Sequence, residues 1–217
     1  MYKGVKRALD VTFSLIGTAV SSPILLAVAA AVKLDSKGPV IFKQERLGKD
    51  GKVFEMYKFR SMCVGAEHMG TGQYSYKGDS RVTRVGKIIR ATSLDELPQF
   101  INILKGDMSF IGPRPELLRY TDAYEGAEKY ILKVRPGITD YSSIEFINLD
   151  EIVGAENADE YYEKYVLKKK NLLRIKYAAT VSLTTDLKLF WFTVWNVIKK
   201  ALKFIFVRKE KDGVLNA

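Results

Sequence analysis

The stretch VTFSLIGTAVSSPILLAVAAAV, residues 11–32, decides how this chain is built. These 22 residues carry no charge, and 15 of them are Val, Ile, Leu, Phe or Ala. At about 1.5 Å per residue, a straight helix of that length reaches about 33 Å, enough to cross the apolar core of a bilayer. The run is too long for a usual cleavable signal peptide and ends in no clean cleavage site. We therefore expect a membrane-associated helix at the N-terminus.

The centre of this run argues against a plain span. Ser21-Ser22-Pro23 lies there, and proline removes a helix hydrogen bond and clashes with the preceding turn. Basic residues flank both ends: Lys3, Lys6 and Arg7 before the run, and Lys33, Lys37 and Lys43 after it. Because such flanks favour the cytoplasmic side, we predict a re-entrant hairpin that is broken at Ser22-Pro23 and stays in one leaflet. A kinked complete span and a buried core helix are the alternatives.

The C-terminal residues 186–217 combine apolar and basic side chains. The apolar ones fall at helical spacing: Trp191, Val194, Trp195, Ile198, Leu202 and Ile205. The basic ones lie around them: Lys199, Lys200, Lys203 and Arg208. Tryptophan beside a basic face is typical of an amphipathic helix lying in the membrane interface. We predict such a helix here, with an ordinary core-facing helix as the alternative.

Composition limits the chemistry of the whole chain. The 217 residues include 35 Lys and Arg against 25 Asp and Glu, a formal net charge of +10, which points to an anionic partner. One cysteine, Cys63, excludes an internal disulfide framework and a thiolate-rich zinc site. One histidine, His68, disfavours a histidine metal cluster or a Ser-His-Asp triad. Acid–base or nucleophilic chemistry is therefore left to carboxylates, lysines and hydroxyls.

The middle of the chain has the pattern of an α/β domain, a helix-dominated α+β fold. Residues 40–42 and 53–57 are strand-like and flank Asp50-Gly51, a strong hairpin signal. Helices are expected over residues 81–90, 93–104, 116–134 and 156–170, with a long loop at 63–78 and a turn at 136–137. We divide the chain into a re-entrant membrane helix (1–37), a cytoplasmic catalytic domain (38–185) and an interfacial helix (186–217).

The acidic pair in Ser93-Leu94-Asp95-Glu96 is the leading candidate for chemistry. Its spacing is that of a capping box, which is a purely structural explanation. The same spacing places Asp95 in the first turn of a helix, where free N–H groups and the helix dipole hold a carboxylate ionised. That end also receives phosphate, so the pair suits nucleophilic attack on phosphorus.

Basic residues that loops can gather around this pair support a phosphate site. They are Lys58, Arg60, Arg81, Arg84, Arg90, Arg114 and Arg135. Arg114 lies between two prolines, so its guanidinium can be aimed at a pyrophosphate. Asp79 and Asp107 are candidates for further oxygen ligands of Mg²⁺. Taken singly, each arginine has the alternative of a solvated surface charge.

A series of ordered motifs extends these observations. They follow Lys6-Arg7 and Asp10 as GPVIF (38–42), ERLG (45–48), YKFRSM (57–62), RVTRVG (81–86), SLDELPQ (93–99), GDMS (106–109), GPRPE (112–116) and RPGIT (135–139). The series closely resembles the bacterial sugar transferases that are monotopic polyprenyl-phosphate phosphoglycosyl transferases. The resemblance is dense over residues 3–139 and looser beyond. The chain resembles the minimal catalytic form, with nothing before the re-entrant helix.

This resemblance implies a specific reaction. Such enzymes move a sugar-1-phosphate from a UDP-sugar to undecaprenyl phosphate, release UMP, require Mg²⁺ and use a ping-pong route through a phospho-aspartate. Motif by motif, it implies that Asp95 is the nucleophile and lies near the metal, with Glu96 as its acidic partner. Lys58 and Arg114 then contact phosphate, and Arg135 and Thr139 lie at the nucleotide end. We count Arg60, Arg81 and Arg90 among the substrate-binding residues.

The resemblance also implies a location and partners. We expect a monotopic protein of the bacterial inner membrane, with its catalytic domain on the cytoplasmic face, bound to anionic phospholipid and able to pair as a homodimer. No nucleic acid is expected, because no groove-reading motif is visible. Residues 140–146, DYSSIEF, depart from the usual family pattern. A glycosyltransferase that releases UDP, and a non-enzymatic basic membrane-binding module, are the alternatives.

Overall fold

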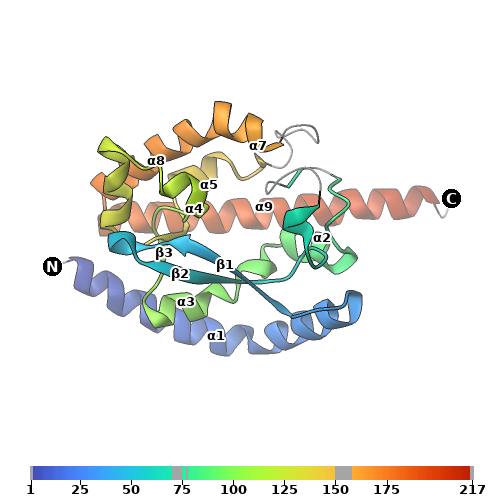
Figure 1. Cartoon of the computed structure of the whole chain (residues 1–217). Coiled ribbons are helices and arrows are strands. Elements are labelled where there is room, and N and C mark those ends of the chain that lie inside the picture. The colour runs from blue at the N-terminus through green and yellow to red at the C-terminus, as the bar shows by residue number, and fades with distance from the viewer. Residues whose placement is uncertain (1, 70–74, 77, 150–157, 216–217) are drawn as a thin grey trace.

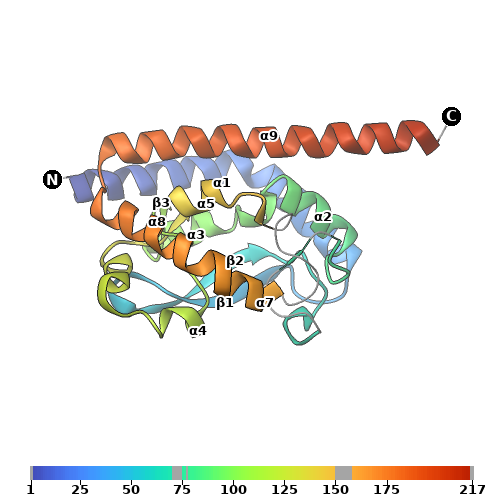
Figure 2. The same cartoon turned by 90° about the horizontal axis from the view of Figure 1, so that it is seen from above.

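The computed structural model describes residues 2–69, 75–76, 78–149 and 158–215. Helices dominate this α+β fold, as predicted, and two small sheets of two strands each lie among them. The two longest helices are α1 (Tyr2–Asp35) and α9 (Leu183–Leu215). Both run along one face of the molecule, and the rest of the fold lies on the other side of them (Figure 2). The predicted domain boundaries stay predictions.

The break predicted at Ser22-Pro23 is wrong, because the helix α1 continues through it. It is one continuous helix with Pro23 inside it, and it bends partway along its length (Figure 1). Pro23 lacks the N–H that would bond the carbonyl of Ala19, and the Ser22 hydroxyl donates to that carbonyl instead, at 2.8 Å. The Ser21 hydroxyl likewise donates to the Gly17 carbonyl at 2.6 Å. These hydroxyls satisfy the helix around the proline, so the chain bends without a break.

Both halves of α1 pack on the globular part. In the first half, the buried Asp10 carboxylate accepts hydrogen bonds from Ser109 Oγ at 3.0 Å and from the backbone N–H of Phe110 at 3.1 Å. In the second half, Val28 and Val32 join a core cluster. The opposite side of the helix is exposed and apolar. By length and composition, α1 is the one helix among the described residues that is suited to cross a membrane.

The predicted hairpin is confirmed. Strands β1 (Ile41–Leu47) and β2 (Val53–Phe59) pair antiparallel. Asp50 and Gly51 take the positive φ values, 57° and 76°, that such a tight turn needs. Phe54 and Met56 of β2 are buried against the helix α3 (Gln99–Lys105). The hairpin lies between α1 on one side and α7 (Ala158–Tyr161) and α8 (Lys168–Ala179) on the other (Figure 1).

The segment after the hairpin differs from the expected pair of long helices. The loop at 63–78 contains a 3₁₀ turn, Ala66–His68, and residues 70–74 and 77 lie outside the described part. The helix α2 (Arg84–Ala91) starts at Thr83, whose side chain accepts a hydrogen bond from the Gly86 N–H. A separate 3₁₀ turn, η3 (Leu94–Glu96), then precedes α3.

The capping box predicted at Ser93 is wrong. Ser93 has a left-handed backbone, with φ of 57°, and its side chain caps nothing. A capping serine needs an extended backbone, so the helix predicted over 93–104 is divided into η3 and α3. The predicted end before Gly106 is confirmed, since α3 ends at Lys105 and Gly106 closes it with φ of 94°.

The second sheet replaces the turn expected at 136–137. Strand β3 (Ser109–Ile111) pairs parallel with β4 (Gly137–Thr139). Gly112 and Gly137 approach so closely that a Cβ on Gly137 would lie 2.1 Å from the Gly112 nitrogen. The helix predicted over 116–134 is interrupted instead. It is divided into α4 (Leu118–Thr121) and a 3₁₀ segment (Gly126–Lys133), because Gly126 has a positive φ of 50°.

The C-terminal half covers the second sheet with helices. α5 (Tyr141–Glu145) follows β4, and residues 150–157 lie outside the described part. The helix predicted over 156–170 is described from residue 158 and extends further, as α7 (Ala158–Tyr161), a π-helical turn (Tyr162–Leu167) and α8 (Lys168–Ala179). α9 begins beside α1, where Asp186 accepts hydrogen bonds from Tyr2 at 2.5 Å and Lys6 at 2.6 Å.

Candidate active site

The acidic pair lies on η3, between α2 and α3. Both Asp95 and Glu96 are half-buried. Lys58 comes to Glu96 from β2, and Arg114 comes from the loop after β3. The Asn102 side chain fixes the position of β2, since its Oδ1 accepts from the Tyr57 N–H at 2.9 Å and its Nδ2 donates to the Glu55 carbonyl at 2.7 Å. Segments far apart in sequence thus meet at one acidic turn.

Glu96 is held as a carboxylate by two cations. Arg114 donates to both Glu96 oxygens; its Nη1 lies 3.1 Å from Oε2, and its Nη2 bonds Oε1. Lys58 Nζ lies 3.2 Å from Oε1. Burial alone would raise the pKa of Glu96, but the charges of Arg114 and Lys58 outweigh it and lower that pKa to about 2. Glu96 is therefore ionised and fixed in place.

Asp95 differs from Glu96 in its partners and in the direction of its pKa shift. Within the part of the chain that the structure describes, its carboxylate makes no hydrogen bond and no ion pair. Burial, and then the negative charge of Glu96, raise the pKa of Asp95 to about 6, against the opposing charges of Lys58, Arg90 and Arg114. The expectation of a helix terminus that lowers this pKa is wrong, because η3 has three residues and is not an α-helix. Asp95 thus has unpaired oxygens and ionises just below neutral pH.

Arg114 is oriented from its backbone outward. Its Nη1 donates to the Ile138 carbonyl at 2.6 Å, and its own N–H donates to Asp140 Oδ2 at 3.3 Å. Asp140 is fully buried and also caps α5 by accepting from the Ser143 N–H at 2.7 Å. Sequence reasoning missed Asp140 as a positioning residue. The available signal was an Asp three residues before Ser143, the spacing of an N-cap, although no helix was predicted there.

Several predicted substrate-binding residues have other partners. Arg60 is buried and donates to carbonyls at the end of α1, Ser36 at 2.7 Å and Val32 at 3.4 Å. Arg81 pairs with Asp79 at 2.7 Å and donates to the Ala66 carbonyl. The side-chain bonds of Arg60 and Arg81 described here are therefore made to other groups and not to the acidic pair. Asp79, proposed as a metal ligand, is likewise engaged by Arg81.

The residues expected at the nucleotide end also make structural contacts. Arg135 Nε donates to the Gly106 carbonyl at 2.9 Å, at the end of α3. The Thr139 hydroxyl is buried and lies 2.8 Å from that of Thr193 on α9. Asp107 forms an ion pair with Lys105 at 3.3 Å. Of the predicted basic residues, Lys58 and Arg114 touch the acidic pair, and Arg90 acts on Asp95 through its charge.

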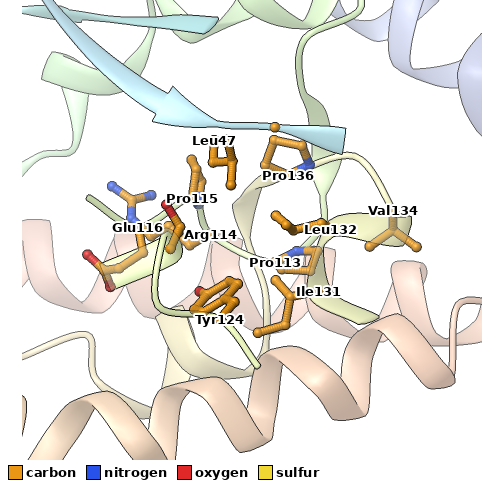
Figure 3. A pocket seen from close by; sticks show the side chains of 12 residues that line it. Leu47, Pro113, Arg114, Pro115, Glu116, Tyr124, Ile131, Leu132, Val134 and Pro136 are labelled. Atoms are coloured by element: carbon orange, nitrogen blue, oxygen red, sulfur yellow. The ribbon is translucent and has the colours of Figure 1, made fainter. Parts of the chain in front are cut away.

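A small cavity lies beside the loop that carries Arg114. It has a volume of about 10 Å³, room for about one water molecule. Figure 3 shows proline and aliphatic side chains facing one another across it: Leu47, Pro113, Pro115, Ile131, Leu132 and Pro136. This space is too small for a sugar nucleotide, so it serves the packing behind Arg114.

The chain belongs to the bacterial sugar transferase family, whose sequence profile matches residues 1–200. It is 46% identical over 147 residues to the UDP-N-acetylgalactosamine-undecaprenyl-phosphate N-acetylgalactosaminephosphotransferase of Aeromonas hydrophila, covering 66% of this chain and 34% of that protein. It is 42% identical over 193 residues to the UDP-glucose:undecaprenyl-phosphate glucose-1-phosphate transferase of Klebsiella pneumoniae, covering 88% and 39%. The protein of the same name from Caulobacter vibrioides is 40% identical, covering 87% and 68%. The chain thus matches well under half of the first two relatives' length.

Proposed function

We propose that this protein transfers a sugar-1-phosphate from a UDP-sugar to undecaprenyl phosphate and releases UMP. The observation that carries the proposal is that the two acidic residues differ in their partners and in their pKa. Glu96 is ionised and held by Arg114 and Lys58, whereas Asp95 beside it is unpaired and has a pKa of about 6. Relatives whose names describe this reaction, at 40–46% identity, support the same conclusion.

In the first half-reaction, an Asp95 oxygen attacks the sugar-bearing phosphorus of the donor. An Asp95–phosphorus bond forms, the bond from that phosphorus to the bridging oxygen breaks, and UMP leaves with the electron pair. The cations Arg114 and Lys58 face the charge that develops on the phosphoryl oxygens, while Glu96 fixes their geometry. In the second half-reaction, an oxygen of the lipid phosphate attacks the same phosphorus and Asp95 is released as a carboxylate.

Asp95 is the residue that fits a magnesium ion. Its carboxylate oxygens are unpaired among the described residues, and Mg²⁺ favours one or two carboxylates together with substrate phosphates. The described residues offer no group of three or more metal-ligating side chains, so substrate phosphates and water would complete the site. When bound, Mg²⁺ neutralises phosphate charge. We expect Mg²⁺ affinity to be weak without nucleotide and to rise when a UDP-sugar is present.

The membrane assignment rests on two exposed apolar surfaces. Val20 and Leu26 of α1 are 75% and 73% exposed, and Trp191 of α9 is 66% exposed. We propose that α1 inserts into one leaflet as a bent re-entrant helix and that α9 lies at the interface with anionic lipid, which keeps the catalytic domain on the cytoplasmic side of the bacterial inner membrane. Pairing of two copies through these helices remains a prediction, to be checked by native mass spectrometry in detergent.

The nucleotide product tests the reaction. Purified protein with undecaprenyl phosphate, Mg²⁺ and a panel of UDP-sugars is expected to release UMP with at least one of them. Release of UDP would indicate transfer of the sugar without its phosphate and contradict the role of Asp95. Lipid binding that weakens with salt, with no nucleotide released from any donor, would indicate a non-enzymatic membrane module instead.

A further inference from the structure

Strand β4 and the residue after it hold the loop that carries Arg114. The Gly137 N–H donates to the carbonyl of Pro113 at 3.1 Å. The Ile138 carbonyl accepts from Arg114 Nη1 at 2.6 Å, and the Asp140 carboxylate accepts from the Arg114 N–H at 3.3 Å. The position of β4 therefore sets both the backbone of this loop and the direction of the Arg114 guanidinium.

Thr139, the last residue of β4, connects the strand to α9. Its carbonyl accepts from the Gly112 N–H at 3.0 Å, at the start of the Arg114 loop. Its side chain points to the face opposite that of Ile138, because neighbouring side chains of a strand alternate. This side chain is buried, and its hydroxyl lies 2.8 Å from the hydroxyl of Thr193, within hydrogen-bond distance. Thr193 of α9 thus bonds the strand that orients Arg114.

One face of α9 packs against both strands of the second sheet. Asp186 accepts hydrogen bonds from α1, and Leu189 is buried in a cluster with Ile111 of β3. Thr193 comes four residues after Leu189 and bonds β4. Spacings of three and four residues put these side chains on the same face of a helix. The position of α9 is therefore fixed relative to the Arg114 loop.

The other face of α9 is apolar and exposed. Trp191 and Trp195 are 66% and 57% exposed, and each lies two residues from Thr193 in the sequence. A helix turns by about 100° per residue, so both tryptophans lie about 160° around the helix from Thr193. Under the proposed function this exposed face lies in the membrane interface. One helix then contacts the membrane on one side and β4 on the other.

We propose that Thr193 is a positioning residue for the reaction, which fixes β4 through the Thr139 hydroxyl and thereby holds Arg114 at the reacting phosphate. The inference rests on the proposed function and adds to it a role for α9 in the active site. A cation that is displaced from the developing charge stabilises the transition state less. The charge of Arg114 also lowers the pKa of Asp95, so a displaced Arg114 leaves that pKa higher.

The test measures UMP release by the full chain with undecaprenyl phosphate, Mg²⁺ and a UDP-sugar that supports transfer. Thr193→Val removes the hydroxyl, Thr193→Ser keeps it, and Thr184→Val makes the same change at an exposed position of α9. We expect Thr193→Val to lower kcat about 3- to 10-fold and to move the inflection of the pH–rate profile to higher pH. Thr193→Ser and Thr184→Val should stay within about twofold of the wild type in kcat, with the inflection unchanged.

A double substitution separates the positioning of Arg114 from a packing role. Because Thr193 acts through Arg114, adding Thr193→Val to Arg114→Met should change the remaining rate by less than about twofold. The unfolding temperature should respond to Thr193→Val equally in both backgrounds, since the Thr139 bond is lost in each. A merely structural role would lower the rate by the same factor in both backgrounds, and that result overturns the inference.

Two further results overturn the inference and leave the proposed function intact. The first is a Thr193→Val protein with the kcat and the inflection pH of the wild type. The second is a Thr193→Ser protein as slow as Thr193→Val, because the hydroxyl would then not be the group that matters. A wild-type protein that releases no UMP with any UDP-sugar contradicts the proposed function as well.

Discussion

The loop 112–116 contributes to two carboxylate–arginine pairs that have opposite surroundings. Arg114 pairs with Glu96, and their side chains are 25% and 21% exposed. Glu116 pairs with Arg174, and theirs are 6% and 1% exposed. Around Glu116, protein groups supply the partners: Arg174, Tyr162 and the Leu117 N–H. Next to Glu96 stands Asp95, whose oxygens have no partner among the described residues. The same kind of pair is therefore closed by protein groups at one place, and at the other it lies beside a carboxylate that we propose to be the nucleophile.

The largest effect is expected from a substitution of Asp95, beside the exposed pair. Asp95→Asn removes the proposed nucleophile, so the rate of sugar-phosphate transfer should fall about 10³-fold or more. Thermal stability should stay the same or rise, because the substitution removes a charge next to Glu96. Asp122→Asn is the matched control, since that aspartate is exposed at the end of α4 and lies outside the acidic pair. Equal activity losses in the two variants would contradict the assignment.

The next largest effect is expected from removing Arg174 of the buried Glu116–Arg174 pair. Arg174→Met leaves the Glu116 carboxylate buried without its main cation, so the free energy of unfolding should fall by about 3–5 kcal/mol. Arg114→Met should cost clearly less, because Glu96 keeps Lys58 and partial contact with water. Chemical denaturation of both variants measures the difference. Equal losses of stability would mean that both pairs serve the fold.

The dependence on pH sharpens the contrast within the acidic pair. The proposed attack requires ionised Asp95, so the rate of the first half-reaction should rise with pH through about 6 and level off above 7. Glu96→Gln should move this inflection to lower pH, because the Glu96 charge raises the pKa of Asp95. A pH–rate profile of UMP release gives the inflection pH of the wild type and of Glu96→Gln. Equal inflection pH values would exclude an effect of the Glu96 charge on the pKa of Asp95.

The same raised pKa makes a prediction for stability. The folded state binds the Asp95 proton more tightly than the unfolded state, so protonation stabilises the fold fully below pH 3.8, and this contribution is lost as pH rises through 6. The stability of the wild type relative to Asp95→Asn should therefore decline over that range. Unfolding midpoints measured from pH 4 to pH 7 test this.

The smallest expected effect concerns an exposed ion pair. Lys43 and Glu55 lie 3.0 Å apart on the hairpin, with side chains 56% and 48% exposed. Lys43→Ala should change the free energy of unfolding by less than about 1 kcal/mol, because water screens the pair. A loss comparable to that of Arg174→Met would mean that burial does not explain the contrast.

Local patterns in the sequence were sufficient for part of this structure. The hairpin at Asp50-Gly51 and the end of α3 before Gly106 follow from positive φ angles that few residues adopt. Lys58 and Arg114 were also expected near the acidic pair, but as contacts to phosphate; their bonds to Glu96 were not predicted.

The errors have long-range or backbone causes. Arg60 and Arg135 were expected to bind substrate, but they bond carbonyls at the ends of α1 and α3, which no local pattern reveals. The prediction of a helix break at Pro23 was wrong because the Ser22 hydroxyl donates to the carbonyl that the proline leaves free. Asp95 was expected at a helix terminus, and the left-handed Ser93 before it starts a 3₁₀ turn instead.

The most direct test of the central claim, that Asp95 receives the phosphosugar before the lipid does, omits the lipid. Purified protein is mixed with Mg²⁺ and a UDP-sugar that supports transfer, but without undecaprenyl phosphate, and UMP and the intact protein mass are measured together. We predict one equivalent of UMP per chain and a protein heavier by one sugar-phosphate group, located at Asp95 and absent from Asp95→Asn. UMP that is released only after the lipid is added, with no change in protein mass, would contradict the claim.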